Sequence, residues 1–517
     1  MLSYCRIVSI VFEIFLLKTD KNPVDLHAKQ FTKIQIQNLM ETKASQLDLE
    51  ATSKSLEAYF SKSIVPALEK LIEIPNLSKL FDDDYLTNGL AEKASDFIVD
   101  WCQKLGLKGL DTKIYNDEGY SPLIFAEIAA SGPSAKGTFL FYGHFDKQPH
   151  LTKDWREGLH PTKPVIEDGK LYGRGGADDG YSIFATMTAL KIVQEQGLPH
   201  PRCIFIMEGD EESASGDVEY YLEKYHERFG EISLITILDS GCADYSTLWV
   251  TTTLRGFVCV DVNIAVSTEG IHSGEGSGTI PECFRISRIL LNRLEDVETG
   301  KMHEKLRVKL TKKRMAEAIE VAALYDNKKI ADDYPFLEGV TPVHGKDNVK
   351  TYMARVWEPT LTVTGIDGLP EVAKAGNVLN PSLTMRLSIR IPPTLDHDAA
   401  KDFVIKELER DPPYGAKVNV EHIGGGGGFD SPVMVEQLET IVENASQNFF
   451  GHKAKYFGEG GSIPLMNHLK KIHPKAQWLV LGVLGPQSNA HGPNEFLEIE
   501  YTKKLVGCLT QVIADFK

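Results

Sequence analysis

The chain has 517 residues, which is enough for two or more domains that each bury a hydrophobic core. Its hydrophobic content of 42% and charged content of 25% are typical of an ordinary globular protein. Because 72 acidic residues outweigh 56 basic ones, for a net charge of -16, the composition argues against a nucleic-acid partner, which would need a basic face.

Residues 1–46 are predicted to be an extension ahead of the globular part. Residues 7–17 are apolar but interrupted by Glu13, and they are too few to cross a bilayer, so no membrane span is expected. Basic residues on both sides leave organellar targeting open, and Met40 is an alternative start. The seven cysteines are scattered without CxxC spacing, which predicts free thiols, a reducing compartment and a cytoplasmic protein.

Helical spacing dominates the first part of the globular region, over residues 48–107, where apolar positions recur three and four apart. Pro66 is expected to kink or restart the first helix. Residues 137–142, GTFLFY, are continuously apolar, as expected for a central strand covered on both faces. This strand leads directly into His144 and Asp146 of the motif GHFD.

The next segments alternate between strand and helix. A Gly-rich loop at 170–180 runs into a helix, and a strand at 203–207 runs into the acidic turn MEGDEESAS. A further helix precedes a strand at 232–238, after which Asp239 follows. This order predicts an α/β fold with a mostly parallel sheet.

The pattern changes to α+β in the middle of the chain. Residues 249–265 are rich in β-branched types, residues 281–294 and 304–324 have helical spacing, and residues 382–391 alternate strictly. We therefore predict that residues 256–425 form an inserted second domain, with the five glycines at its end as a hinge.

The two flanking segments, residues 47–255 and 426–517, are then expected to form one catalytic domain. In the second of them helical spacing returns over residues 434–449, and a strand is predicted at 478–484. A loop with His491 and a terminal helix close the chain.

Residues that can bind metals gather at the ends of the predicted strands and in the adjacent loops. Open α/β sheets bind ligands at the carboxyl ends of their strands. Two imidazoles with several carboxylates suit Zn2+, Mn2+ or Co2+, and the excess of carboxylates indicates two metals that share one. An isolated acidic pair is more often a solvated turn, but several such motifs in this order favour a metal site. The candidates are His144, Asp146, Asp178, Asp179, Glu211, Glu212, Asp239 and His491.

These motifs resemble those of the dinuclear-metal peptidases, a family that includes cytosolic non-specific dipeptidase, carnosinase, glutamate carboxypeptidase, aminoacylase and the acetylornithine and succinyl-diaminopimelate deacylases. The similarity runs in family order along nearly the whole globular part, and the branch of non-specific dipeptidase and carnosinase is the most similar. The carrying motifs are YGHFDKQP (142–149), LYGRGGADDG (171–180), EGDEESAS (208–215), LDSG (238–241), IHSG (271–274), SIRIPP (388–393), GEGGSIP (458–464) and NAHGPNE (489–495).

The resemblance implies two divalent metal ions per chain, Zn2+ foremost, with Asp178 as the shared ligand and a cis peptide bond after it. Asp146 would receive the other ring N–H of His144, which sets the tautomer. Glu211 would be the general base that takes a proton from the attacking water and returns it to the leaving amine. The remaining ligands would be His144 and Asp239 on one metal and Glu212 and His491 on the other.

The resemblance also implies residues on the substrate side. Arg390 is similar to the arginine that binds the substrate carboxylate, and Gly461 and Ser462 would line the substrate terminus. His272 is similar to a histidine that reaches the scissile carbonyl from the partner subunit. This implies a homodimer through the inserted domain, which would also be a lid. From the residues alone, His272 could be an ordinary loop histidine and Arg390 a solvated strand residue.

Two positions depart from the family pattern. Gly180 follows Asp178-Asp179 where the family usually has lysine, and Gly458 stands where the dipeptidase branch commonly has arginine. Neither is a metal ligand, so we expect metal binding to be kept and substrate selectivity to be affected. Asp210 is left without a role and is expected at the surface.

The leading hypothesis is a metal-dependent hydrolase that cleaves the amide bond of dipeptides or short peptides, as a dipeptidase or carboxypeptidase-like exopeptidase. An N-acyl-amino-acid amidohydrolase or deacylase with the same mechanism is an alternative. A catalytically silent structural subunit is a further alternative, although the five ligands and Glu211 are all present.

Overall fold

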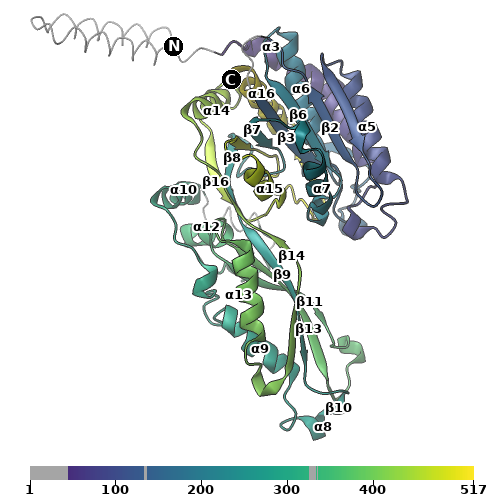
Figure 1. The fold of residues 1–517 in the computed structure, drawn as a ribbon, viewed down its shortest axis with the longest axis vertical. Coiled ribbons are helices and arrows are strands. Elements are labelled where there is room, and N and C mark those ends of the chain that lie inside the picture. The colour runs from purple at the N-terminus through teal and green to yellow at the C-terminus, as the bar shows by residue number, and fades with distance from the viewer. Residues whose placement is uncertain (1–44, 133–136, 325–333, 335) are drawn as a thin grey trace, which may run out of the picture. The chain divides into compact units, whose positions relative to one another are not determined.

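Six strands form the largest sheet of the computed structural model, which describes residues 45–132, 137–324, 334 and 336–517 (Figure 1). The strands β3, β6, β7 and β17 run parallel to one another, while β1 and β2 add an antiparallel edge. The predicted α/β fold with a mostly parallel sheet is therefore confirmed. In spatial order the strands are β1 (Leu110–Tyr115), β2 (Leu123–Ile128), β6 (Arg202–Glu208), β3 (Thr138–His144), β7 (Ile232–Ile237) and β17 (Gln477–Val480).

Helices cover both faces of this sheet. Phe139 and Phe141 of β3 belong to one hydrophobic core, whereas Leu140 and Tyr142 point to the other face and belong to a second core. The first core includes α5 (Leu90–Lys104), α6 (Tyr181–Glu195) and α16 (Ile499–Asp515); the second includes α7 (Gly216–Lys224) and α15 (Leu465–Ile472). This two-sided burial explains why the predicted central strand is apolar throughout.

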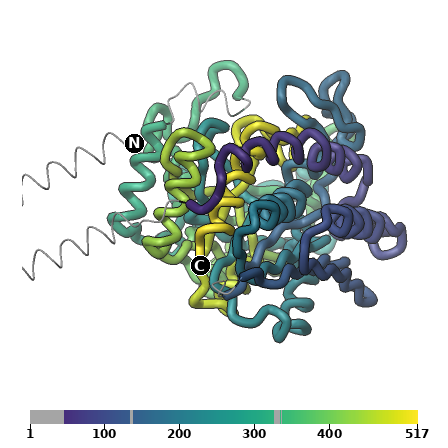
Figure 2. Tube along the Cα trace, turned by 90° about the horizontal axis from the view of Figure 1, so that it is seen from above, coloured from purple at the N-terminus to yellow at the C-terminus, as the bar shows by residue number. Residues whose placement is uncertain are grey.

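The C-terminal helix α16 packs beside α6 and beside α14 (Glu436–Phe449), as Figures 1 and 2 show. The first core takes in residues from Leu47 to Phe516, so segments far apart in the sequence share it. Near the N-terminus, α3 (Leu49–Tyr59) continues through a wider helical turn at Phe60–Ile64 into α4 (Val65–Ile72). Pro66 lies in the first turn of α4, so the α-helix restarts there after the wider turn, as the sequence predicted.

A four-stranded antiparallel sheet forms the middle of the chain. Its order is β11 (Thr360–Asp367), β13 (Ser382–Ile391), β9 (Gly256–Ala265) and β14 (Lys417–Gly426). Buried and less buried positions alternate along β9 and β13, and the buried side packs against α9 (Cys283–Leu294) and α13 (His397–Glu409). The predicted domain boundaries at residues 256 and 425 coincide with the first strand and the last strand of this sheet, but Leu47–Lys517 forms one compact unit, so these boundaries stay predictions.

The helix predicted over residues 304–324 was wrong in its first part. Only a short turn, Glu304–Leu306, is helical there, and α10 (Lys312–Ala322) begins afresh. Thr311 ends the break because its hydroxyl accepts a hydrogen bond from the backbone N–H of Arg314 and caps the new helix.

Smaller elements complete the fold, together with α12 (Asn348–Val356). One three-stranded sheet joins β15 (Phe429–Asp430), β8 (Trp249–Leu254) and β16 (Lys455–Glu459). Another joins β18 (Phe496–Glu498), β5 (Lys170–Tyr172) and β4 (Val165–Glu167). A two-stranded ribbon pairs β10 (Ile271–His272) with β12 (Val378–Leu379), and α8 (Ser273–Gly276) follows β10.

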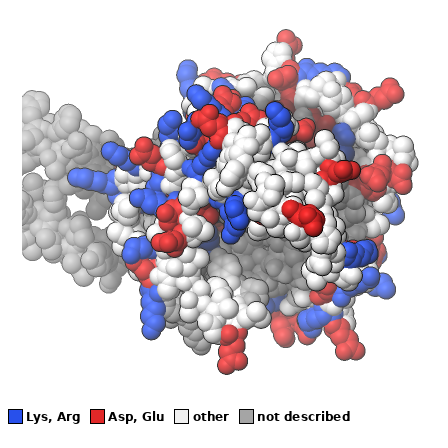
Figure 3. All heavy atoms as spheres, turned by 90° about the horizontal axis from the view of Figure 1, so that it is seen from below, with Lys and Arg blue, Asp and Glu red and all other residues white. Residues whose placement is uncertain are grey.

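The structure can be compared with what the composition predicted about surface charge, membrane spans and cysteines. On the face drawn in Figure 3, Lys and Arg side chains alternate with Asp and Glu and form no continuous basic area among the described residues. Among the described helices, none combines the length and the apolar character that crossing a membrane requires. Six cysteines are free thiols, and Cys5 lies outside the described residues: Cys102, Cys203, Cys242, Cys259, Cys283 and Cys508.

Candidate metal centre

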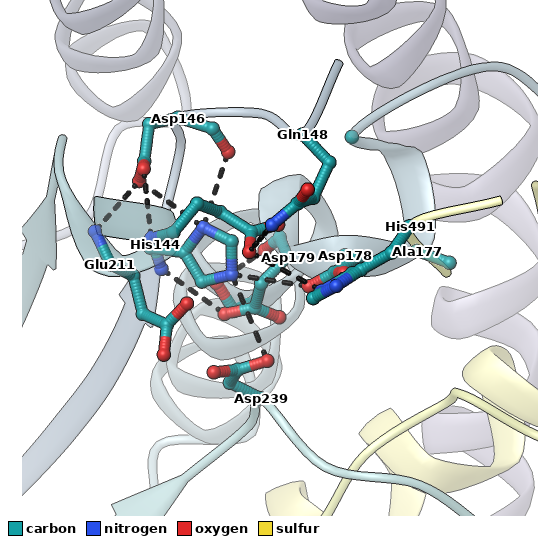
Figure 4. Close-up of polar contacts among 12 residues, drawn as sticks. His144, Asp146, Gln148, Ala177, Asp178, Asp179, Glu211, Asp239 and His491 are labelled. Carbon is teal, nitrogen blue, oxygen red and sulfur yellow. Dashed lines mark hydrogen bonds and ion pairs between the residues drawn. The ribbon is translucent and has the colours of Figure 1, made fainter. Parts of the chain in front are cut away.

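The carboxyl ends of β3, β6 and β7 bring the predicted metal ligands to one edge of the sheet (Figure 4). His144 is the last residue of β3, and Asp239 follows the end of β7. Glu212 lies in the turn that follows β6. Because parallel strands end on the same side of the sheet, these three residues lie near one another. Asp178 comes from the loop before α6, and His491 from the loop between β17 and β18.

The two oxygens of Asp178 face two different histidines. Oδ1 lies 3.2 Å from Nε2 of His144, which also lies 3.7 Å from Oδ1 of Asp239. Oδ2 lies 3.2 Å from Nε2 of His491, which also lies 3.3 Å from Oε2 of Glu212. The five predicted ligands therefore form two groups, each with one imidazole and one further carboxylate, that meet at Asp178.

These spacings fit divalent metal ions. Two ligand atoms bound at about 2.1 Å to one tetrahedral Zn2+ lie about 3.4 Å apart, which is close to the four separations above. Ligand atoms of His144, Asp178 and Glu212 lie within 4.8 Å of one another, and so do those of His144, Glu211 and Asp239. The donor set of imidazole nitrogens and carboxylate oxygens suits zinc, manganese or cobalt.

The electrostatics of the site also call for a cation. Burial and the neighbouring Asp239 raise the pKa of Glu211 well above its usual range, and burial together with Asp178 does the same to Glu212. For Asp178, burial opposes ionisation, but hydrogen bonds with His144 and His491 outweigh it and lower its pKa. Several carboxylates packed together out of water repel one another, and a bound dication would relieve that repulsion.

Asp146 has the predicted contact with His144 and a second one that the sequence did not suggest. Its Oδ1 lies 3.3 Å from Nδ1 of His144. Its two oxygens also accept hydrogen bonds from the backbone N–H groups of Glu211, at 3.2 Å, and Glu212, at 3.1 Å. Asp146 therefore holds the imidazole on β3 and the acidic turn after β6 in one arrangement.

The peptide bond between Asp178 and Asp179 is cis, as the resemblance implied. Oδ2 of Asp179 accepts a hydrogen bond of 3.2 Å from the backbone N–H of His144. It therefore supports the strand end and is separate from the ligand groups.

The expectation that Asp210 lies at the surface was wrong. Its side chain folds beneath the turn, where the residue is 3% exposed, and its Oδ2 accepts a hydrogen bond of 3.0 Å from the backbone N–H of Asp217 in α7. Burial raises the pKa of Asp210 to about 7. The first turn of a helix offers unpaired N–H groups, which explains why this carboxylate packs inward.

Gln148 is a site residue to which the sequence assigned no role. Its Nε2 donates a hydrogen bond of 2.6 Å to Oε2 of Glu212. It belongs to the motif YGHFDKQP, so its neighbourhood was visible in the sequence but its contact was not. The amide orients the carboxylate that faces His491.

On the predicted substrate side, Arg390 and Ser462 lie together. Nη1 of Arg390 donates a hydrogen bond of 3.1 Å to Oγ of Ser462, and its guanidinium lies over the ring of Phe257. Gly461 is exposed beside Ser462. Arg390 is thus a partly buried residue of β13 rather than a solvated one.

His272 is not brought to this cluster within the chain. It lies on β10, its side chain is exposed, and Nδ1 accepts a hydrogen bond of 3.1 Å from the backbone N–H of Gly274.

The two departures from the family pattern have local explanations. The backbone N–H of Gly458 donates to the hydroxyl of Tyr352 at 2.7 Å, and any side chain at Gly458 would overlap Thr253. A Cβ at Gly180 would lie 2.8 Å from Cδ2 of Leu71. Both glycines therefore allow close approaches that a lysine or an arginine would prevent.

Known proteins with similar sequences are peptidases. The chain is 28% identical over 369 residues to the Cysteinylglycine-S-conjugate dipeptidase of Corynebacterium striatum, covering 70% of this chain and 77% of that protein. It is 26% identical to the Cys-Gly metallodipeptidase DUG1 of Candida albicans, covering 91% and 97%. It is 27% identical to the human Beta-Ala-His dipeptidase, covering 74% and 76%.

Solved structures support the fold. Human carnosine dipeptidase 1 superposes with a TM-score of 0.74 at 21% identity, covering 91% of this chain and 99% of that chain. The di-peptidase Dug1p of Saccharomyces cerevisiae gives a TM-score of 0.73 at 21% identity, with the same coverage. The sequence model described as "Peptidase family M20/M25/M40" matches residues 140–515. The chain therefore belongs to the peptidase family M20/M25/M40.

Proposed function

We propose that the protein is a two-metal dipeptidase that hydrolyses the peptide bond of dipeptides or short peptides, with Glu211 as general base. The observation that carries this proposal is the position of Asp178, whose two oxygens each face a histidine and lie between two further carboxylates. Membership of the peptidase family and the dipeptidase names of its relatives support the substrate class.

Five residues would hold the metals, which we propose to be Zn2+, with Mn2+ or Co2+ able to replace it. Asp178 would be shared between them. When bound, the metals supply Lewis-acid polarisation of the scissile carbonyl and lower the pKa of water. One metal would lie between His144, Asp178 and Asp239, and the other between Asp178, Glu212 and His491.

Glu211 would move the proton. Its carboxylate would take a proton from the attacking water and deliver it to the leaving amine nitrogen. Burial raises its pKa, which brings a carboxylate closer to the range in which it can accept and return a proton near neutral pH. Asp146 would fix the ring of His144 and, through its two backbone contacts, the place of Glu211.

Arg390 would bind the carboxylate at the substrate terminus. A guanidinium presents two parallel N–H donors that match a carboxylate, and the hydrogen bond to Ser462 orients it. Gly461 and Ser462 would line the same end of the substrate.

We also propose a homodimer in which the segment over residues 256–425 forms the interface and a lid. His272 is exposed and lies apart from the ligand groups of its own chain, so it would act on the carbonyl in the partner's site. The free cysteines support a reducing, cytoplasmic location.

Gly458 departs from the dipeptidase pattern and is the reason to test one alternative substrate class. The dipeptidase branch commonly has an arginine there, and its absence changes the charge beside the substrate loop. N-acyl amino acids present the same amide and the same carboxylate, so an amidohydrolase or deacylase would use the same residues.

The test is metal analysis of the purified protein, followed by hydrolysis assays on a panel of dipeptides and N-acetyl amino acids after loading with Zn2+ or Mn2+. We expect two metal ions per chain and dipeptide hydrolysis. Hydrolysis of N-acetyl amino acids alone would select the alternative. Absence of bound transition metal together with no hydrolysis after loading would overturn the proposal.

A further inference from the structure

A buried ion pair lies behind the candidate metal centre. Nη1 of Arg174 donates to Oε2 of Glu495 at 2.7 Å, and the two side chains are 1% and 0% exposed. Arg174 follows β5, and Glu495 immediately precedes β18. Burying two charges is costly unless further hydrogen bonds compensate, so the remaining contacts of the two side chains indicate what the pair does.

Glu495 binds the backbone of the shared ligand. Its Oε1 accepts hydrogen bonds from the N–H groups of Ala177 and Asp178, both at 3.2 Å, and from that of Gly175 at 3.1 Å. One carboxylate oxygen therefore binds three backbone N–H groups of the loop that carries Asp178, including that of Asp178 itself.

Arg174 binds the loops on either side of that carboxylate. Its Nη2 donates to the carbonyl oxygen of Gly492 at 2.7 Å, next to His491 in sequence. The same nitrogen donates to the carbonyl oxygen of Pro149 at 3.1 Å, next to Gln148. The planar guanidinium can reach both carbonyls and Glu495 together because its donors point in fixed directions.

The loop of His491 depends on such anchors. The His491 side chain is 58% exposed, its φ is +65°, and Gln487, Asn489 and Asn494 in the same loop also have positive φ. His491 lies outside the regular strands and helices, so its ring must be held near the buried Asp178 by contacts of the loop itself. The hydrogen bond from Arg174 to Gly492 ties the loop to the same pair that holds Asp178.

We infer that Arg174 and Glu495 are positioning residues that set the distance between Asp178 and His491 and thereby the affinity of the second metal, held by Asp178, Glu212 and His491. This inference rests on the proposed two-metal function. The metal between His144, Asp178 and Asp239 depends less on the pair, because His144 and Asp239 lie at the ends of β3 and β7.

Two substitutions each remove a different part of the contacts made by the ion pair. Arg174→Lys keeps a cation beside Glu495 but removes the fork that reaches Gly492 and Pro149. Glu495→Gln keeps an acceptor for the backbone N–H groups but removes the charge. The matched control is Arg156→Lys, which alters an ion pair with Glu167 whose side chains are 47% and 46% exposed.

The experiment is a calorimetric titration of the metal-depleted full chain with Zn2+, repeated with Co2+ and followed by its absorption. Both variants are expected to bind the second metal about 10- to 100-fold more weakly, and the first metal with a clearly smaller loss of affinity, because Asp178 is shared by the two positions. Their activity is expected to fall at limiting metal and to recover at saturating metal, which a general loss of stability would not produce. The control is expected to match the wild type.

Each other outcome has a definite meaning. If the wild type binds fewer than two metals, the two-metal proposal fails, and the inference fails with it. If the wild type binds two metals and the variants bind both with wild-type affinity, the inference alone is overturned. If the variants do not fold, or lose affinity equally at both positions, the pair contributes to general stability and the inference is likewise overturned.

Discussion

His491 and Asp178 meet across the candidate metal centre, with Nε2 of the histidine 3.2 Å from Oδ2 of the aspartate. The histidine comes from an irregular loop near the C-terminus, and the aspartate from the loop before α6. The opposite oxygen of the same carboxylate faces His144, which comes from a third segment. One carboxylate thus joins two groups of ligands, and the chemistry proposed for the site depends on how accurately these separate segments are held.

Glu211→Gln removes the proposed base and preserves the shape of the side chain. Loss of proton transfer is expected to lower kcat by about 10²- to 10⁴-fold. Both metals should remain bound, because Glu211 is not one of the proposed ligands. Steady-state kinetics and metal analysis on the same sample test this, with the exposed Glu223→Gln as control. Activity close to that of the wild type would remove Glu211 from the base role.

Arg390→Lys keeps the charge but loses the two-pronged donor. Because the substrate carboxylate would then be bound by a single point charge, kcat/KM is expected to fall about tenfold or more, mainly through KM. Arg386 lies on the same strand and pairs with Asp261, so Arg386→Lys is the matched control. An unchanged KM for Arg390→Lys would show that this arginine does not bind the substrate.

The role of His272 across a subunit interface can be tested by mixing two inactive variants. His272→Ala lacks the histidine, and Glu211→Gln lacks the proposed base. In a mixed dimer, one site would combine Glu211 from one chain with His272 from the other. Hydrolysis is therefore expected to return after the two variants are dissociated and reassembled together. A mixed population that stays inactive, while reassembled wild type is active, would contradict the shared site.

Lys147 should make stability depend on pH. Its Nζ is buried and donates to the carbonyl oxygens of Leu71, at 2.7 Å, and Ile74, at 2.5 Å, and burial lowers its pKa to about 7. The ordinary value is about 10.5, so between these values the unfolded chain binds a proton that the folded chain does not. The free energy of unfolding therefore rises with pH in that window.

Lys147→Met removes this titration. Between about pH 6.5 and 8.5, the wild type is expected to gain about 1–2 kcal/mol of unfolding free energy relative to the variant. Urea unfolding at both pH values measures it, and the exposed Lys153→Met serves as control. A difference between wild type and Lys147→Met that does not vary with pH would contradict the lowered pKa.

Gly143 leaves no room for a side chain beside the candidate metal centre. An added Cβ would overlap Oγ of Ser182 and Oδ2 of Asp179. Gly143→Ala is therefore expected to cost about 1–3 kcal/mol of stability and to lower activity by displacing the backbone of His144. At Gly216 an added Cβ meets no atom within 4 Å, so Gly216→Ala is the control for thermal unfolding and assay. Equal effects of the two substitutions would contradict the steric argument.

The amino-acid pattern was enough to predict most secondary-structure types and the residue types of the candidate site. The apolar run before His144 predicted a strand, because a strand buried on both faces is apolar throughout. The strict alternation over residues 382–391 predicted β13, because successive side chains of a strand point to opposite faces. The order of strands and helices placed His144, Glu212 and Asp239 at one edge. Family resemblance supplied the proposed shared role of Asp178 and the expectation of a cis peptide bond after it.

The contacts between distant segments became visible with the three-dimensional fold. The sequence could not show that Asp210 accepts a hydrogen bond from the first turn of α7, that Gln148 binds Glu212, or that residues 307–311 break a helical pattern. It also could not join Arg174 to Glu495. Periodicity is set by neighbours a few residues apart, whereas these contacts depend on how whole strands and helices pack. The ligand residues can thus be read from the chain, but the distances that hold them come from packing alone.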